Sequence, residues 1–204
     1  MTPEQIEEHN RVFETATQLV KGEIIVQGPP FPSNCPQSLR LKLEHAIQLF
    51  TRALEINPSN WSAMWLIGKI HQRFGDNSTA LTWFGRSHRI NPSQADVARE
   101  ASICAMALGR SEEAISYACS AVRSQPHNSG LQANLSLAFL LASKLDDAKV
   151  TIEKAIVNDP MDPISQTIRS MVAHFVDSGE KAPSTTVALE DYWKKYGKPG
   201  TATD

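Results

Sequence analysis

Four prolines recur along this chain at one constant interval. Twelve residues before each proline stands an alanine of a second series with the same interval. The two series are Pro58, Pro92, Pro126 and Pro160, and Ala46, Ala80, Ala114 and Ala148. A fixed period in this range is typical of a solenoid of stacked helical hairpins. Because such chains usually present a surface to partners, the period constrains both the fold class and the function class.

The repeat at residues 61–94 predicts a helix, a turn and a second helix. Its first half places apolar residues at helical spacing, and Gly75-Asp76-Asn77 then interrupts the pattern as a turn does. Apolar spacing resumes from Ala80 and ends at Asn91-Pro92, because proline lacks an amide hydrogen and disfavours helix in the residue before it. Each 34-residue unit is therefore expected to be one helical hairpin.

The pattern resembles the tetratricopeptide repeat (TPR) family over roughly residues 36–177. Eight places of the family motif are held in this repeat by Met64, Ile67, Gly68, His71, Ala80, Phe84, Ser87 and Pro92. His71 and Ser87 depart mildly from the pattern, and the next repeat is unusually rich in alanine. The resemblance implies an all-α fold, a right-handed α-α superhelix of TPR hairpins with an N-terminal insertion and C-terminal capping helices.

The repeat register predicts how the chain is organised. Residues 1–57 hold an N-terminal helix, a proline-rich insertion and a degenerate TPR unit, residues 163–196 are C-terminal capping helices, and residues 197–204 are a disordered tail. The three-unit array, residues 58–160, has repeats at 61–94, 95–128 and 129–162. The insertion at 22–36 is too rich in proline for a continuous helix and too apolar for a free linker. It is either a covered extension of the hairpin or a binding loop.

Composition excludes several classes of protein. With 204 residues and 41% apolar residues, we expect one domain with a good-sized core. A net charge of −2 argues against a nucleic-acid partner, and no apolar run is long enough to insert into a membrane. The three cysteines, Cys35, Cys104 and Cys119, lack the spacing of a metal site, which favours a reduced, cytoplasmic setting.

No residue pattern indicates catalysis or a cofactor. The six histidines are scattered, and no phosphate loop, nucleophile elbow or zinc motif is present. His71 takes a place usually given to an aromatic packing residue, and Cys104 and Cys119 are expected to be small buried thiols. The sequence therefore predicts a protein that is not an enzyme and that holds no metal and no cofactor.

The family resemblance implies that the first helices of successive units line a concave groove. Twelve residues are predicted to form this protein-binding groove: Trp65, Lys69, Arg73, Arg99, Ile103, Met106, Asn134, Leu137, Leu140, Leu141, Met171 and Phe175. The groove begins mixed and charged and becomes apolar towards its C-terminal end. Since apolar surface on that scale is rarely left to water, a partner segment, a second copy or the chain itself should cover it.

A final amphipathic helix carries an aromatic face at the C-terminus. Its apolar residues, at spacing i, i+3, i+4 and i+7, are Leu189, Tyr192, Trp193 and Tyr196. This helix either caps the last repeat or serves as a lid on the groove, since the polar segment 177–184 is long enough for both.

We therefore predict a scaffold or adaptor that binds a peptide or helix of another protein in the concave groove. Two alternatives remain open at this point. One is a dedicated chaperone that shields a single client protein, and the other is a homo-oligomeric assembly protein, such as a homodimer. The identity of the partner does not follow from the residues.

Overall fold

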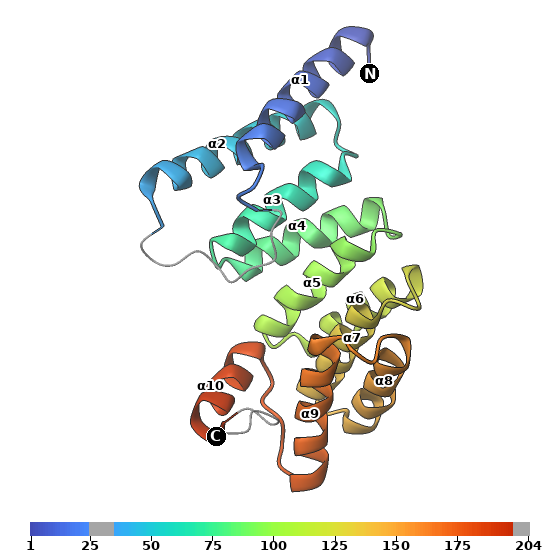
Figure 1. Ribbon diagram of the computed structural model, residues 1–204. Helices are drawn as coiled ribbons and strands as arrows, with labels where there is room; N and C mark the ends of the chain where they lie inside the picture. Colours follow the sequence, from blue (N-terminus) through green and yellow to red (C-terminus); the bar gives the residue numbers. More distant parts are fainter. Residues whose placement is uncertain (25–34, 198–204) are drawn as a thin grey trace. The chain divides into compact units, whose positions relative to one another are not determined.

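The computed structural model describes residues 1–24 and 35–197, and all of its regular elements are α-helices (Figure 1). The chain divides into two compact units, Met1–Pro92 and Ser93–Asp204. This differs from the single domain expected from the length, and the boundary falls after the first repeat of the predicted array. In stacked-repeat proteins each hairpin contacts mainly its neighbours, so division between hairpins is physically natural.

The first unit consists of two helical hairpins. Helices α1 (Pro3–Val20) and α2 (Gln37–Ile56) pack against each other, as do α3 (Trp61–Arg73) and α4 (Asn77–Ile90) (Figure 1). Thr2 and Gln5 close a capping box at the start of α1. Asn60 caps α3 and also donates a hydrogen bond from Nδ2 to Nε2 of the buried His9 (3.0 Å). These contacts join α1 to the start of α3.

A continuous apolar core lies within the first unit. Val20, Ile24, Leu43 and Phe50 are fully buried in this core, together with Ile67 and Ile70 of α3. Ile24 is the first apolar residue of the insertion, and its side chain is buried in this core. Ile25, Val26 and Phe31 of the insertion, and the tail from Lys198 onward, lie outside the described residues, so the two interpretations of the insertion stay predictions.

The second unit continues the repeats. Its helices are α5 (Ala95–Ala107), α6 (Ser111–Ser124), α7 (Ser129–Leu141), α8 (Leu145–Asn158), α9 (Pro163–Ser178) and α10 (Thr186–Tyr196). Helix α5 pairs with α6, and α7 pairs with α8. Helix α7 also packs on α5, α6 and α9. An all-round apolar helix such as α7 needs neighbours on every side, and this arrangement supplies them.

Small residues allow the two helices of each hairpin to approach closely. The hydroxyl of Ser102 donates to the carbonyl of Ala114 (3.0 Å), and that of Ser136 donates to the carbonyl of Ala148 (2.8 Å). Gly68 takes the same place in the repeat at 61–94, where a Cβ atom would lie 2.6 Å from Cε1 of Phe84. The periodic alanines Ala114 and Ala148 therefore lie where the two helices of a hairpin meet.

Candidate functional site: the first-helix face

The first helices of successive hairpins in the second unit, α5, α7 and α9, form one face of that unit. We call it the first-helix face. Helix α7 packs against both α5 and α9, so it lies between them. Ile103, Leu137 and Met171 stand at the same place of the repeat on the three helices, and all three are half-buried. The repeat thus places one partly exposed apolar side chain on each helix of this face.

The predicted groove residues of this unit fall into two groups, those with half-buried side chains and those with buried side chains. Arg99 and Asn134 are half-buried, like the three residues above. The remaining four are buried: Met106, Leu140, Leu141 and Phe175. These four side chains belong to the core as the structure stands. The exposed part of the groove is therefore smaller than the sequence pattern suggests.

The polar groups of the face are engaged within the second unit. Nη2 of Arg99 lies 3.1 Å from Oε1 of Glu100 and 3.4 Å from Oδ1 of Asp96. Glu100 is almost fully buried, so Arg99 offsets a carboxylate that would be costly to bury alone. Asn134 donates from Nδ2 to the hydroxyl of Ser102 (3.2 Å), which joins α7 to α5. Arg99 and Asn134 therefore have structural roles in addition to any contact with a ligand.

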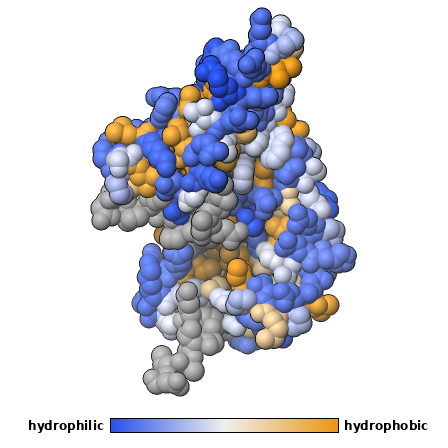
Figure 2. Space-filling model, turned by 45° about the horizontal axis from the view of Figure 1, so that its top comes forward, coloured by the Kyte–Doolittle hydropathy of each residue, from blue (hydrophilic) through white to orange (hydrophobic). Residues whose placement is uncertain are grey.

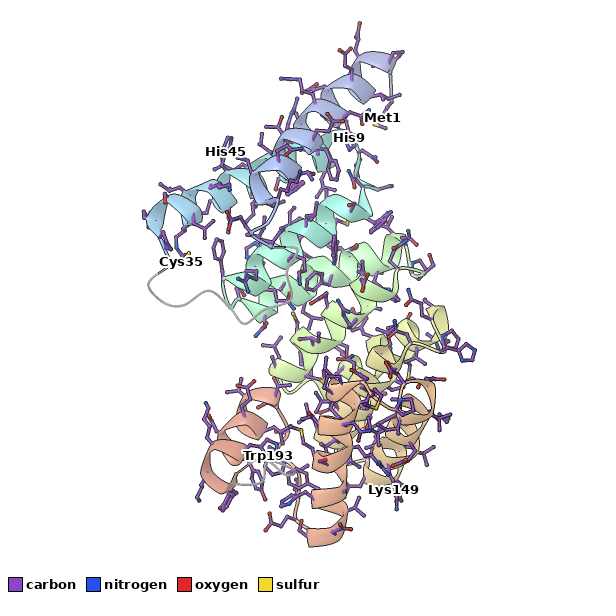
Figure 3. The ribbon with its side chains drawn as sticks, viewed as in Figure 1. Met1, His9, Cys35, His45, Lys149 and Trp193 are labelled. Atoms are coloured by element: carbon purple, nitrogen blue, oxygen red, sulfur yellow. The ribbon has the colours of Figure 1, made fainter. Side chains whose placement is uncertain are left out.

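The C-terminal helix α10 packs over the first-helix face. It contacts α5, and its rings contact α9, the two helices that flank α7. Trp193 lies with its ring centroid 5.0 Å from that of His174 and 5.6 Å from that of Phe175. Figure 3 shows the Trp193 side chain on the side of α10 that faces α9. Helix α10 therefore contacts two of the three helices that form the first-helix face.

A short chain of hydrogen bonds joins α9, α10 and the segment between them. The hydroxyl of Tyr192 donates to Oε2 of Glu180 (2.6 Å) and lies 2.9 Å from Nε2 of His174. The hydrogen bond to Glu180 raises the pKa of Tyr192 to about 12. The phenol, which is protonated near neutral pH even at the usual pKa of 10.0, therefore remains a hydrogen-bond donor to higher pH. Of the predicted lid residues, Leu189 and Trp193 are buried, Tyr192 is half-buried and Tyr196 is exposed.

The three remaining groove residues lie on α3 in the first unit. Trp65 and Arg73 are half-buried. Lys69 is buried and donates from Nζ to Oε1 of Gln72 (2.9 Å). These side chains belong to the first compact unit, whereas the first-helix face belongs to the second.

The structure also shows the surroundings of the histidine and cysteine side chains that could have bound a metal or reacted. Nδ1 of His71 lies 3.6 Å from Oδ2 of Asp76, and burial lowers the pKa of this histidine. Cys104 is buried as predicted, whereas Cys119 is half-buried because it lies away from the α5–α6 contact made by Ala114 and Ala118. Within residues 1–24 and 35–197, no three histidine, cysteine or acidic side chains gather into a metal-binding group. In the same ranges, none of the helices has both the length and the apolar character needed to cross a membrane.

The side of the molecule shown in Figure 2 is mainly hydrophilic. On the side shown in Figure 2, hydrophobic residues form small patches between larger hydrophilic areas. Several large apolar side chains outside the first-helix face are also exposed, among them Val150, Val157 and Met161. Single exposed apolar residues of this kind are normal on soluble domains and do not define a site.

Comparison with known proteins identifies the fold. No family model matches the sequence. A stretch of 80 residues, 38% of the chain, is 30% identical to the transcription factor tau 131 kDa subunit of Saccharomyces cerevisiae, and it spans only 8% of that protein. The structure of YrrB, described as a TPR protein with an unusual peptide-binding site, matches with a TM-score of 0.61 and 17% identity. That match covers 89% of this chain and 91% of YrrB.

A second solved structure agrees. A tetratricopeptide repeat protein from Parabacteroides merdae matches with a TM-score of 0.68 and 12% identity, over 93% of this chain and 67% of that one. The chain has the tetratricopeptide repeat fold. The predicted resemblance and the predicted all-α fold class are thereby confirmed. At these identities the likeness concerns the TPR fold and leaves the ligand of the first-helix face open.

The residues predicted from the sequence omit two in the segment between α9 and α10, Glu180 and Ala182. The sequence places Glu180 in a polar segment, whereas in the structure its carboxylate accepts the hydrogen bond from Tyr192. Ala182, which is buried, continues the alanine series one repeat period after Ala148, so the period itself was an available signal. No sequence signal pairs Glu180 with Tyr192, because their contact depends on how α10 packs.

Proposed function

We propose that this chain is a non-catalytic interaction scaffold whose first-helix face binds a helix or peptide segment of another protein. The observation that carries the proposal is the row of half-buried apolar side chains Ile103, Leu137 and Met171, one on each of α5, α7 and α9. Further burial of such side chains stabilises a complex by about 25 cal/mol per Å². The description of YrrB as a TPR protein with a peptide-binding site supports the same class of function.

The face suits an apolar helix better than a charged peptide. Its arginine, Arg99, already lies beside Asp96 and Glu100, and the amide of Asn134 already donates to Ser102. A ligand that relied on these groups would have to compete with contacts inside the protein. Apolar contact with the row at 103, 137 and 171 requires no such exchange.

A peptide selection tests the proposal. A displayed library of helical peptides is selected on the full chain and, in parallel, on a Leu189→Asp chain in which docking of α10 is weakened. We expect enriched peptides with an apolar stripe, and we expect Leu137→Asp to weaken their binding at least about tenfold, roughly 1.4 kcal/mol. Binding is measured by fluorescence anisotropy with purified chains.

The matched control is Val150→Asp, which introduces the same charge at an exposed position of α8. This variant should bind the selected peptides like the parent, and circular dichroism should show that both variants stay helical. If a folded Leu137→Asp chain binds as tightly as the parent, the first-helix face is not the binding site. If neither selection enriches any peptide, the scaffold proposal fails.

A further inference from the structure

Helix α10 does not occupy the place of a next repeat helix. In register with α8, which begins at Leu145, a following second helix would begin at residue 179. The structure instead has a non-helical segment over residues 179–185, and α10 begins at Thr186. Its contacts are with α5, two hairpins back along the chain, and with α9. Helix α10 has therefore left the repeat register and turned onto the first-helix face.

The end of the stack remains uncovered by α10. Ile164 and Val176 of α9 are exposed. A cavity of about 170 Å³ opens between α8 and α9, and the described residues that line it, including Ile152 and Val172, all belong to these two helices. A helix that served only to cap the array would be expected to cover this side. Helix α10 contacts α9 through His174 and Phe175 and leaves this other side of α9 exposed, so capping and lid both stay predictions.

Few buried residues hold α10, and one buried hydrogen-bond donor in this contact has no acceptor among the described residues. Only Leu189 and Trp193 of this helix are buried, while Tyr196 and Val187 remain exposed. The indole Nε1 of Trp193 is buried without a hydrogen-bond acceptor among the described residues. A buried donor without an acceptor weakens the closed arrangement, because the same N–H group would bind water if α10 were released. An isolated helix of this length is also unstable in water, so release would be accompanied by unfolding of α10.

The apolar residues of α10 indicate which kind of helix the first-helix face can bind. Its residues stand at spacing i, i+3, i+4 and i+7 and include a leucine, a tryptophan and two tyrosines. His174 and Phe175 receive two of these rings, Tyr192 and Trp193. The charged residues Glu190, Asp191, Lys194 and Lys195 are exposed on the helix.

We propose that α10 is a displaceable lid that occupies the first-helix face as an internal ligand. The partner that displaces it is an amphipathic helix with leucine and aromatic residues at the same spacing. This inference rests on the proposed function and specifies the partner chemistry of the same face. The apparent affinity for such a partner equals its affinity for the open face multiplied by the fraction of molecules in which α10 is released.

The test supplies α10 in trans. The probe is a fluorescently labelled synthetic peptide of residues 182–197, titrated into the full chain and measured by anisotropy. The lid-opening variant is Leu189→Asp, at a side chain that is 5% exposed, and the matched control is Val187→Asp, at one that is 57% exposed on the same helix. We expect Leu189→Asp to bind the peptide at least about tenfold more tightly than the parent does. Val187→Asp should bind it like the parent.

Two additional measurements guard against an unfolded variant. Tyr192→Phe keeps the ring but removes the hydroxyl that joins His174 and Glu180, so it should raise peptide affinity by less than Leu189→Asp does. Amide hydrogen exchange in residues 186–196 of the parent should become faster at saturating peptide, because the bound peptide replaces α10. A Trp193→Ala version of the peptide should not bind.

Several outcomes would overturn the lid. The first is that the parent and a helical Leu189→Asp chain bind the peptide equally well. The second is that the Leu189→Asp chain does not bind the peptide at all. The third is that hydrogen exchange in α10 of the parent does not change when the peptide is added. A parent chain that forms a dimer by exchanging α10 between copies would also overturn it, and light scattering would show this. If library peptides bind at Leu137 while Leu189→Asp changes nothing, the proposed function stands and the lid fails. If the α10 peptide binds the opened chain but no library peptide does, the lid stands and the scaffold proposal fails.

Discussion

At the scale of single residues, the hairpin turns show why particular amino acids recur. Gly75, Gly109 and Ser143 hold the same place of the repeat, just after the C-cap residues of the first helices of three hairpins. All three have positive φ (80°, 70° and 58°). Glycine adopts this left-handed conformation without steric cost, whereas a side chain at Cβ raises its energy. Among non-glycine residues of the described ranges, Ser143 alone has positive φ.

Replacing Ser143 with glycine should therefore stabilise the second unit. We expect Ser143→Gly to raise the free energy of unfolding by about 1 kcal/mol, because the strain of the left-handed serine is removed. The gain is reduced somewhat by the greater freedom of glycine in the unfolded chain. Urea unfolding followed by circular dichroism measures the change.

The reverse substitution provides the control. Gly75→Ser at the equivalent turn should destabilise the first unit by a similar amount, about 1 kcal/mol. A Ser143→Gly chain that is less stable than the parent would show that the serine side chain contributes more than its backbone conformation costs.

At the scale of elements, the start of α9 is fixed by its cap. The carboxylate of Asp162 accepts hydrogen bonds from the backbone N–H groups of Ile164 (3.3 Å) and Ser165 (3.1 Å), and from the Ser165 hydroxyl. The hydroxyl of Ser165 is the main reason that the pKa of Asp162 lies below its usual value of 3.8. The sequence predicts this cap from Asp162 followed by Pro163.

Asp162→Ala should cost about 1 kcal/mol of unfolding free energy at about pH 7. Because the folded pKa is depressed, the parent keeps this contribution above the unfolded value of 3.8 and loses it as the pH falls through the folded pKa. The difference between parent and Asp162→Ala should therefore shrink at acid pH. Urea unfolding at several pH values measures it.

Asp162→Asn separates the cap from the charge. Asparagine is an equally good N-cap but does not titrate, so this variant should have stability close to the parent near neutral pH. It should lack the pH-dependent loss seen with aspartate. Equal stability of Asp162→Ala and the parent at neutral pH would contradict a capping role.

At the scale of the whole molecule, the division at Pro92 and Ser93 predicts two folding units. Each has buried apolar residues of its own, around Phe50 and Ile67 in the first unit and around Ala98 and Leu131 in the second. We expect fragments 1–92 and 93–204 to be helical when expressed separately and to unfold cooperatively, since repeat stability is built from contacts between neighbouring elements. Circular dichroism with thermal unfolding tests this.

One result for the fragments would contradict the prediction of two folding units. If either fragment has the spectrum of an unfolded chain while the full protein is helical, the units depend on each other for stability. The full chain should then show a single transition. Two transitions in the full chain, matching those of the fragments, would support independent units.

The sequence alone determined the helices and the repeat, because both depend on local spacing. Thr2, Asn60 and Asp162 are residue types that favour N-caps, and each accepts a hydrogen bond from the first turn of its helix. Backbone preferences and apolar periodicity act over a few residues, so they are visible in one sequence. The place of the first helices followed from the same period.

Only the tertiary structure decided where α10 packs and how much of the groove is exposed. Residues 177–184 allow α10 to reach either side of α9, and the choice depends on which surface buries Leu189 and Trp193. That competition joins residues far apart in sequence, such as Trp193 with His174 and Thr185 with Gly109. The division into two units is decided in the same way, by the balance of contacts between helices, which the repeat period does not contain.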